Sequence, residues 1–384
     1  MKNQKRSSPS VPVYQPLVGE AEKRNVSECM ESGWISSRGK FVEEFESTFA
    51  NFIGAEHGIG VCNGTVALHL ALESLGIGHG DEVICPTLTY IASANAIRYT
   101  GAEVCFVDSE SSSWNICPDA IEAAINHRTR AIVVVHLYGL PCNMAAISKI
   151  AKKHGLAVVE DCAEAVGASI DGQHVGTFGD IATYSFYGNK TITTGEGGMV
   201  TTRHEDLSIR CRKLRGQGLA EGREYWHDML GFNYRMTNVA AAIGCGQMER
   251  LEQTLERKFE IDQRYRDRLS AEFDFQCVGD GVQHGCWMTS LLAKSNHDKD
   301  SVRSALKNQH VETRPVFFPL HSMPIYQSRF LLASGKEFSN ATAISGRGLT
   351  LPSYPDLANT QIDHICDSIL QAVDSQRHAD RKAA

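Results

Sequence analysis

The segment Thr-Tyr-Ser-Phe-Tyr-Gly-Asn-Lys-Thr-Ile-Thr-Thr-Gly-Glu-Gly-Gly, residues 183–198, places one lysine between an apolar run and a glycine-rich turn. No other cation lies near Lys190 in the sequence. A desolvated amine loses its proton more easily, and a neutral amine can add to a carbonyl. The segment therefore predicts an inward-pointing amine of the kind that holds pyridoxal phosphate as a Schiff base. A surface lysine in a glycine-rich loop is the alternative.

Around this segment, short β-rich runs alternate with helical patterns from residue 57 to about residue 200. The expected strands cover 58–62, 82–85, 104–107, 131–135, 157–159, 182–186 and 199–202, and the expected helices cover 66–75, 91–99, 118–126 and 144–154. This alternation predicts an α/β fold, with a mainly parallel sheet between helices on both faces. The ligand crevice of such a sheet lies at the carboxyl ends of its strands.

Helical patterns flank this region on both sides. A first helix is expected over 20–32, with Gly33 as its left-handed stop, and Phe41, Phe45, Phe49 and Phe52 form a core-facing stripe at helical spacing. A long helical pattern follows from 236 to about 273. The 384 residues are too many for one small core. We therefore expect four parts: a flexible N-terminus at 1–10, a large cofactor-binding domain at 11–250, a linking helix with a small α+β domain at 251–373, and a flexible tail at 374–384.

Three further groups follow predicted strands. Asn63-Gly64-Thr65 lies between a strand and a helix, where free backbone N–H groups and the helix dipole favour a phosphate. Asp161 ends an apolar strand, and a buried carboxylate there needs a cation such as a protonated pyridine nitrogen. Tyr90 could stack on a planar ring, although a core tyrosine is equally compatible with the pattern. Together with Lys190, these groups predict a pyridoxal phosphate site at one sheet edge.

Composition narrows the class of partner. The chain carries 38 basic and 45 acidic residues, a formal charge of −7, and no dense basic cluster, so nucleic acid is not the expected partner. Its 12 cysteines form no C-x-x-C pair, so we expect no metal site, reduced thiols and a cytoplasmic location. No stretch reaches the ~20 apolar residues of a membrane span. Small-molecule chemistry is the favoured interpretation.

With these motifs in place, the chain resembles the DegT/DnrJ/EryC1/StrS sugar aminotransferases over about residues 11–370. This family belongs to the fold type I pyridoxal-phosphate enzymes, so the resemblance implies an aspartate aminotransferase-like fold. The segments that carry the resemblance are Gly33-Trp34-Ile35-Ser36-Ser37, Asn63-Gly64-Thr65-Val66-Ala67-Leu68, Glu160-Asp161-Cys162-Ala163-Glu164-Ala165, Ser185-Phe186 leading to Lys190, Gly195-Glu196-Gly197-Gly198 and Asn233-Tyr234-Arg235-Met236.

The resemblance implies a role for each cofactor residue. Lys190 would form the internal aldimine, Asp161 would pair with the pyridine nitrogen, and Glu164 would lie near the ring hydroxyl. Many relatives carry Gln where this chain has Glu164, and members of the perosamine branch share the Glu. A dehydratase branch replaces the Schiff-base lysine with histidine, so Lys190 favours transamination.

The family also implies how the cofactor phosphate is bound. Gly64, Thr65 and Ser185 would hold it from the same chain, and Asn233 would reach it from a partner subunit. The active site would then be shared within a homodimer or a dimer of dimers.

Within the family, four segments look most like GDP-perosamine synthases: residues 37–40, 188–193, 225–228 and 318–321. This likeness implies transfer of an amino group from L-glutamate, through pyridoxamine 5′-phosphate, to the 4-keto carbon of a nucleotide-linked 4-keto-6-deoxysugar. GDP-4-keto-6-deoxy-D-mannose would give GDP-perosamine for O-antigen synthesis. The alternatives are a dTDP- or UDP-linked ketosugar, or a non-catalytic pyridoxal-binding regulator. The candidate substrate-binding residues are Trp34, Ser36, Arg38, Lys40, His321 and Arg347.

Overall fold

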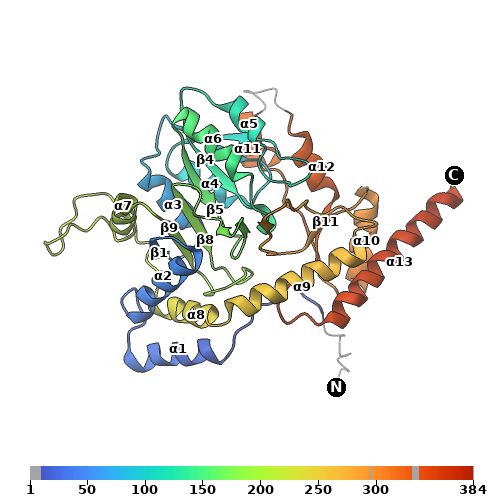
Figure 1. Cartoon of the computed structure of the whole chain (residues 1–384), viewed down its shortest axis with the longest axis horizontal. Coiled ribbons are helices and arrows are strands. Elements are labelled where there is room, and N and C mark those ends of the chain that lie inside the picture. The colour runs from blue at the N-terminus through green and yellow to red at the C-terminus, as the bar shows by residue number, and fades with distance from the viewer. Residues whose placement is uncertain (1–9, 295, 331–336, 384) are drawn as a thin grey trace, which may run out of the picture.

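A seven-stranded mixed sheet lies at the centre of the structure, a computed structural model that describes residues 10–294, 296–330 and 337–383 (Figure 1). Its strand order is β1-β9-β8-β5-β4-β2-β3, and β9 runs antiparallel to both of its neighbours while the other pairs are parallel. The strands are β1 (His57–Val61), β2 (Glu82–Pro86), β3 (Glu103–Val107), β4 (Thr129–Val135), β5 (Ala157–Asp161), β8 (Ile181–Ser185) and β9 (Gly198–Thr202).

Helices cover both faces of this sheet because its strands are apolar on both sides. Along β4, Val133 belongs to the hydrophobic cluster that contains residues of α3, α4 and α7, whereas Val134 belongs to the cluster under α5 and α6. The helices α2 and α8 pack over the β1, β8 and β9 end of the sheet. The helices of this region are α1 (Glu20–Ser32), α2 (Lys40–Ile53), α3 (Gly64–Ser74), α4 (Ala92–Tyr99), α5 (Pro118–Ala124), α6 (Met144–His154), α7 (Glu205–Arg215) and α8 (Asn238–Met248), with the 3₁₀ turn η1 (Leu137–Gly139).

The C-terminal part is built around a second, antiparallel sheet with the order β11-β13-β12. The helices α9, α10 and α13 share a third hydrophobic cluster with this sheet, and α9 crosses between the two parts of Figure 1. Its elements are α9 (Leu251–Leu269), β11 (Ser290–Leu292), α10 (Asn296–Asn308), β12 (Arg314–Pro315), η2 (Leu320–Ser322), α11 (Pro324–Phe330), α12 (Ser339–Arg347), β13 (Gly348–Thr350) and α13 (Asn359–Ala383). A small sheet, β10-β6-β7, joins β10 (Val282–Gln283) to β6 (Ser169–Ile170) and β7 (Gln173–His174).

The structure confirms the mainly parallel α/β fold. All seven predicted strands are present within two residues of their expected ends. The first helix covers residues 20–32 as expected, and Gly33 ends it at φ 75°, in the left-handed region that glycine adopts without steric cost. Phe41, Phe45 and Phe49 are buried, and Phe52 is half-buried against the same cluster.

The helix expected from residue 236 to about 273 is wrong as a single element. The chain breaks at Arg250 (φ −123°), so α8 ends at Met248 and α9 begins at Leu251. The Arg250 guanidinium donates 2.6 Å to the carbonyl of Leu17 and also pairs with buried Glu22. The break therefore lies where the chain contacts the N-terminal segment, which helical periodicity does not reveal.

Two further segments are ones for which the sequence predicted no regular element. Residues 216–233 form a hairpin, bridged at Leu219 and His227, that projects beyond α7 at the left of Figure 1. Within the tail 374–384 the helix α13 continues to Ala383, and the expected flexibility of this tail stays a prediction. The expected flexible N-terminus lies outside the described residues except for Ser10. The domain boundaries at 250 and 373 stay predictions. Among the described helices, none has the length and apolar character required to cross a membrane.

Candidate active site

A cavity of about 720 Å³ opens where the strands of the large sheet end. Residues that follow β1, β2, β4, β5 and β8 form one wall, and β12, β13 and the segment before β11 form the other. The wall includes Asn63, Gly64, Thr65, Thr89, Tyr90, Ser93, Tyr138, Asp161, Glu164, Ser185, Lys190, Glu196, Trp287, Arg314, Phe317 and Thr350. This location agrees with the crevice expected for a parallel sheet.

Lys190 reaches this cavity from the loop after β8. Its Nζ atom lies 3.9 Å from the ring centroid of Trp287, and its backbone carbonyl accepts a 2.6 Å hydrogen bond from the Tyr14 hydroxyl. Part of the side chain is open to the cavity, yet the surrounding protein atoms desolvate the amine. Burial lowers the pKa of Lys190, and the charges of Glu164 and Asp161 oppose that shift. The amine therefore releases its proton more readily than a surface lysine does.

Asp161 is the last residue of β5 and is buried beside the cavity. Its Oδ2 accepts a 2.7 Å hydrogen bond from Ser93, and its Oδ1 accepts a 3.2 Å bond from the Ala163 amide. Burial raises the pKa of Asp161, while these two hydrogen bonds and the Lys190 charge partly offset the rise. A carboxylate in this position is stabilised by any cation that enters the cavity.

Glu164 is also buried, three residues beyond Asp161. Its Oε2 accepts a 2.7 Å hydrogen bond from the amide of Tyr138, a residue held at φ 55° in the turn after β4. Burial raises the pKa of Glu164 to about 7, against the opposing charge of Lys190. The left-handed backbone of Tyr138 is costly for a bulky side chain, so it marks a place where the fold holds a strained turn at the cavity.

The amino end of α3 supplies an anion site in the same wall. Asn63 caps this helix by accepting from the Val66 amide at 3.0 Å, and the first N–H groups of a helix have no partner within it. A Cβ atom on Gly64 would come within 2.7 Å of Ser185 Cβ, so glycine keeps this space open beside a hydroxyl. With Lys190 and Asp161, this cradle fits the phosphate, aldehyde and ring nitrogen of pyridoxal phosphate.

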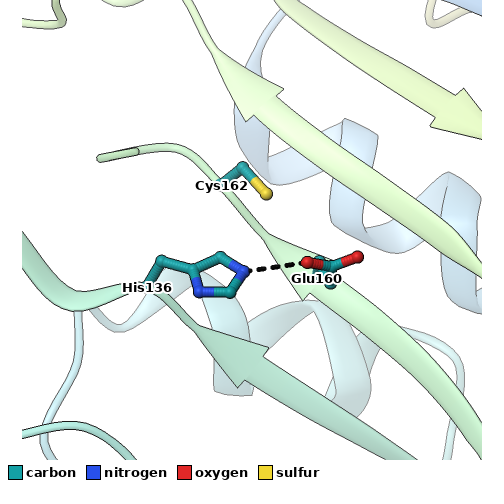
Figure 2. Close-up of side chains that lie close together, drawn as sticks. All are labelled: His136, Glu160 and Cys162. Carbon is teal, nitrogen blue, oxygen red and sulfur yellow. Dashed lines mark hydrogen bonds and ion pairs between the residues drawn. The ribbon is translucent and has the colours of Figure 1, made fainter. Parts of the chain in front are cut away.

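Glu160 and Cys162, the neighbours of Asp161 in the chain, form with His136 a buried cluster of the residue types that bind metals (Figure 2). Glu160 accepts from His136 Nε2 at 3.0 Å and from the amides of Gly176, Phe178 and Gly179. His136 Nδ1 accepts from the Cys142 amide, and burial raises the pKa of the Cys162 thiol. The acceptor atoms of Glu160 and His136 are therefore occupied by hydrogen bonds, and the Cys162 thiol keeps its proton. We interpret the cluster as a set of hydrogen bonds that stabilises the end of β5.

The structure brings seven of the predicted site residues together at the cavity: Gly64, Thr65, Tyr90, Asp161, Glu164, Ser185 and Lys190. Tyr90 is exposed there, with its ring 5.9 Å from that of Phe317. The predicted substrate residues Trp34, Arg38 and Lys40 instead line a separate hollow of about 690 Å³, together with Arg212 and Arg215. Lys40 pairs there with Glu28, and the carbonyl of Ser36 accepts from the Asn238 amide at 2.5 Å.

Three other predicted residues also lie outside the wall of this chain's cavity. Asn233 pairs with Gly216 at the base of the hairpin. His321 accepts or donates a 2.7 Å bond with Thr87 and stacks on Phe338, with ring centroids 4.3 Å apart. Arg347, at the end of α12, faces Asp274 at 3.8 Å. Charge and family likeness therefore identified these residues without indicating which surface they occupy.

The residues of the site that sequence reasoning missed include Ser93, Tyr138 and Trp287. Tyr138 could have been found, because it follows the carboxyl end of the predicted strand 131–135. Ser93 lies inside a predicted helix without a distinguishing signal. The indole of Trp287 contacts Asn189, which lies 98 positions earlier in the chain. No local sequence pattern therefore links Trp287 to Lys190.

Comparison with known proteins shows the family of the chain. The model of the DegT/DnrJ/EryC1/StrS aminotransferase family matches residues 16–370. The GDP-perosamine synthase of Escherichia coli O157:H7 is 48% identical over 359 residues, covering 94% of this chain and 97% of the relative. That of Vibrio cholerae is 41% identical over 362 residues, covering 94% and 98%. The crystal structure of the aminotransferase TlmJ from Streptoalloteichus hindustanus superposes with a TM-score of 0.90 at 30% identity, covering 96% of this chain and all of that one.

Proposed function

Because the chain belongs to the DegT/DnrJ/EryC1/StrS aminotransferase family, we propose that it transfers an amino group from L-glutamate to GDP-4-keto-6-deoxy-D-mannose. The product would be GDP-perosamine, a precursor of O-antigen. The proposed substrate is supported by the 41–48% sequence identity to GDP-perosamine synthases over nearly the full length. The observation that carries the chemistry is the cavity in which Lys190 and Asp161 meet.

Two residues would perform the proton chemistry. When bound, pyridoxal phosphate supplies an electron-withdrawing ring that draws off negative charge from the reacting carbon. Asp161 would hold the proton on the ring nitrogen, because its buried carboxylate is stabilised by a cation. Lys190 would hold the cofactor and, as a free amine, move a proton to and from the reacting carbon, helped by its lowered pKa.

The remaining groups would bind and orient. Gly64, Thr65 and Ser185 would hold the cofactor phosphate at the amino end of α3. Glu164, held by the Tyr138 amide, would face the ring hydroxyl. Among the described residues of the cavity wall, Lys190 and Arg314 are the two basic side chains of the lysine or arginine type. It is therefore the same-chain group best suited to the carboxylate of L-glutamate or the diphosphate of the sugar nucleotide.

A homodimer with shared active sites is part of this proposal. Trp34, Arg38 and Lys40 lie away from the cavity of their own chain, so within an assembly they could serve a neighbour's cavity. The hairpin 216–233 exposes Tyr225 (92%) and Leu230 (89%), apolar side chains that a second copy of the chain could cover. A second copy of the chain that covers this hairpin would also bring Asn233, at its base, close to the partner's cofactor.

We also propose that the protein acts in the cytoplasm. All 12 cysteines are free thiols in the structure, and Cys277 is exposed. Free thiols persist in a reducing compartment such as the cytoplasm.

The substrate proposal is tested by loading the purified enzyme with pyridoxamine phosphate and adding a panel of GDP-, dTDP- and UDP-linked 4-keto-6-deoxysugars. Loss of the pyridoxamine form is followed by absorbance, and the product is identified by mass spectrometry and NMR. We expect fast loss with GDP-4-keto-6-deoxy-D-mannose and amination at C4. Faster reaction with a dTDP- or UDP-linked sugar would replace the substrate, and no reaction with any sugar would contradict the proposed function.

A further inference from the structure

The free amine of Lys190 rests on the face of an aromatic ring. Its Nζ lies 3.9 Å from the centroid of the Trp287 ring, and Trp287 is 4% exposed. The face of an indole carries partial negative charge and attracts a cation, most strongly where water is excluded. The contact therefore favours the protonated form of Lys190 at this position.

Trp287 is fixed in place from three sides. Its indole Nε1 donates 2.7 Å to the carbonyl of Asn189, the residue before Lys190. Its backbone carbonyl accepts a 2.9 Å bond from the buried amine of Lys258, and its ring stacks on Tyr138 with centroids 5.9 Å apart. A ring held in this way keeps its face toward the amine instead of turning away.

Successive contacts connect Trp287 through Lys258 and Tyr14 to the backbone of Lys190. Lys258 also donates to the carbonyl of Ser353 at 2.8 Å, and its Nζ lies 5.2 Å from the centroid of the Tyr14 ring. The Tyr14 hydroxyl in turn donates to the carbonyl of Lys190. The carbonyl of Asn189 thus accepts from Trp287, and the carbonyl of Lys190 accepts from Tyr14. Lys258 contacts both Trp287 and Tyr14 and so connects these two hydrogen bonds.

We propose that Trp287 is a positioning residue that receives the Lys190 ammonium whenever the amine is free of the cofactor. The inference rests on the proposed function, in which Lys190 takes a proton from the reacting carbon and must later return it. The proton then resides on Nζ and the indole face stabilises the ammonium, with no electron transferred. The other charged groups that face this amine are Asp161 at the end of β5 and Glu164 three residues later, with Glu196 and Arg314 elsewhere in the cavity wall.

The test removes charge from the ring face while keeping its shape and its N–H. The protein is produced with tryptophan, monofluoro-, difluoro- or trifluorotryptophan at its four tryptophan positions and loaded with pyridoxamine phosphate, which leaves Lys190 free. The rate of Lys190 acylation by acetic anhydride is then measured against pH by peptide mass spectrometry. We expect the midpoint of the rise to move stepwise toward lower pH, by about half a pH unit in total, because the ammonium loses support.

Two variants assign the shift to one ring. In Trp226→Phe, which lacks an exposed tryptophan of the hairpin whose ring faces Arg223, the fluorine series should produce the same shift. In Trp287→Phe, which keeps an aromatic ring, the series should produce none. An unchanged midpoint in the fluorinated wild-type chain would overturn the proposal, and so would an equal shift in Trp287→Phe. The readout needs no sugar, so a failure of the ketosugar panel alone would refute the substrate and leave the role of Trp287 intact.

Discussion

The hydroxyl of Ser93 donates a 2.7 Å hydrogen bond to Oδ2 of Asp161, and both side chains are buried in the cavity wall. Asp161 comes from the end of β5 and Ser93 from the first turn of α4, so the bond joins two elements at the proposed cofactor site. It favours the charged carboxylate against the effect of burial. Ser93 thereby supports the residue that we expect to hold the pyridine nitrogen.

Ser93→Ala should weaken cofactor binding. Loss of a hydrogen bond to a charged group costs about 2 kcal/mol, or roughly thirtyfold in Kd for pyridoxal phosphate. The measurement is a fluorescence or absorbance titration of the cofactor-free protein. Ser74→Ala is the matched control, because Ser74 is an equally buried serine that bonds the Ala71 carbonyl within α3. Equal Kd values for the two variants would show that Ser93 does not support the cofactor.

Lys190→Ala should abolish covalent retention of the cofactor. Borohydride reduces the C=N bond by which an amine holds pyridoxal phosphate, so reduction of the yellow wild-type protein should fix the cofactor on the Lys190 peptide. The variant should bind cofactor without this trap and lose about 10²–10⁴ in kcat. Peptide mass spectrometry locates the label, and finding it on a different lysine would refute the role of Lys190.

The cofactor-free protein should lose stability as the pH rises from about 4.5 to 7. Glu164 has a pKa raised to about 7, so between about pH 4.5 and 7 the folded state binds more protons than the unfolded state, and the free energy of unfolding falls with increasing pH. At pH 8 the penalty amounts to about 3 kcal/mol. Urea unfolding at several pH values should show that Glu164→Gln removes much of this fall. Glu196→Gln, which removes an exposed carboxylate from the same cavity, is the control. Parallel curves for wild type and Glu164→Gln would contradict the prediction.

Mixed dimers should regain activity if the sites are shared. Lys190→Ala and Asn233→Ala are each expected to be inactive, and a hybrid dimer of the two would contain one site with both native residues. Activity should therefore rise toward about a quarter of the wild-type value per chain, because half of the dimers are hybrids with one intact site of two. Subunit exchange is verified by native mass spectrometry. Verified exchange without regained activity would place Asn233 in the site of its own chain, and a competent monomer in sedimentation would exclude the shared site.

Much of the fold could be predicted because its signals are local. Alternating apolar runs and helical spacing specified β1 to β5, β8 and β9 within two residues, and Gly33 marked a helix end by its left-handed backbone. The residues at strand ends could be predicted for the same reason. Once a parallel sheet is assumed, Gly64, Asp161 and Lys190 must approach one another at its carboxyl edge.

Amino-acid order alone thus specified the sheet, the location of the crevice and the amine and carboxylate within it. Long-range packing specified the rest: the break at Arg250, the Tyr138 turn, and the placement of Trp287 over Lys190. It also turned Trp34 and Arg38 away from the cavity of their own chain. The reason is physical. Periodicity records which face of one short element is buried, whereas these features arise from contacts between segments about 100 or more residues apart, and such contacts form only when the whole chain folds.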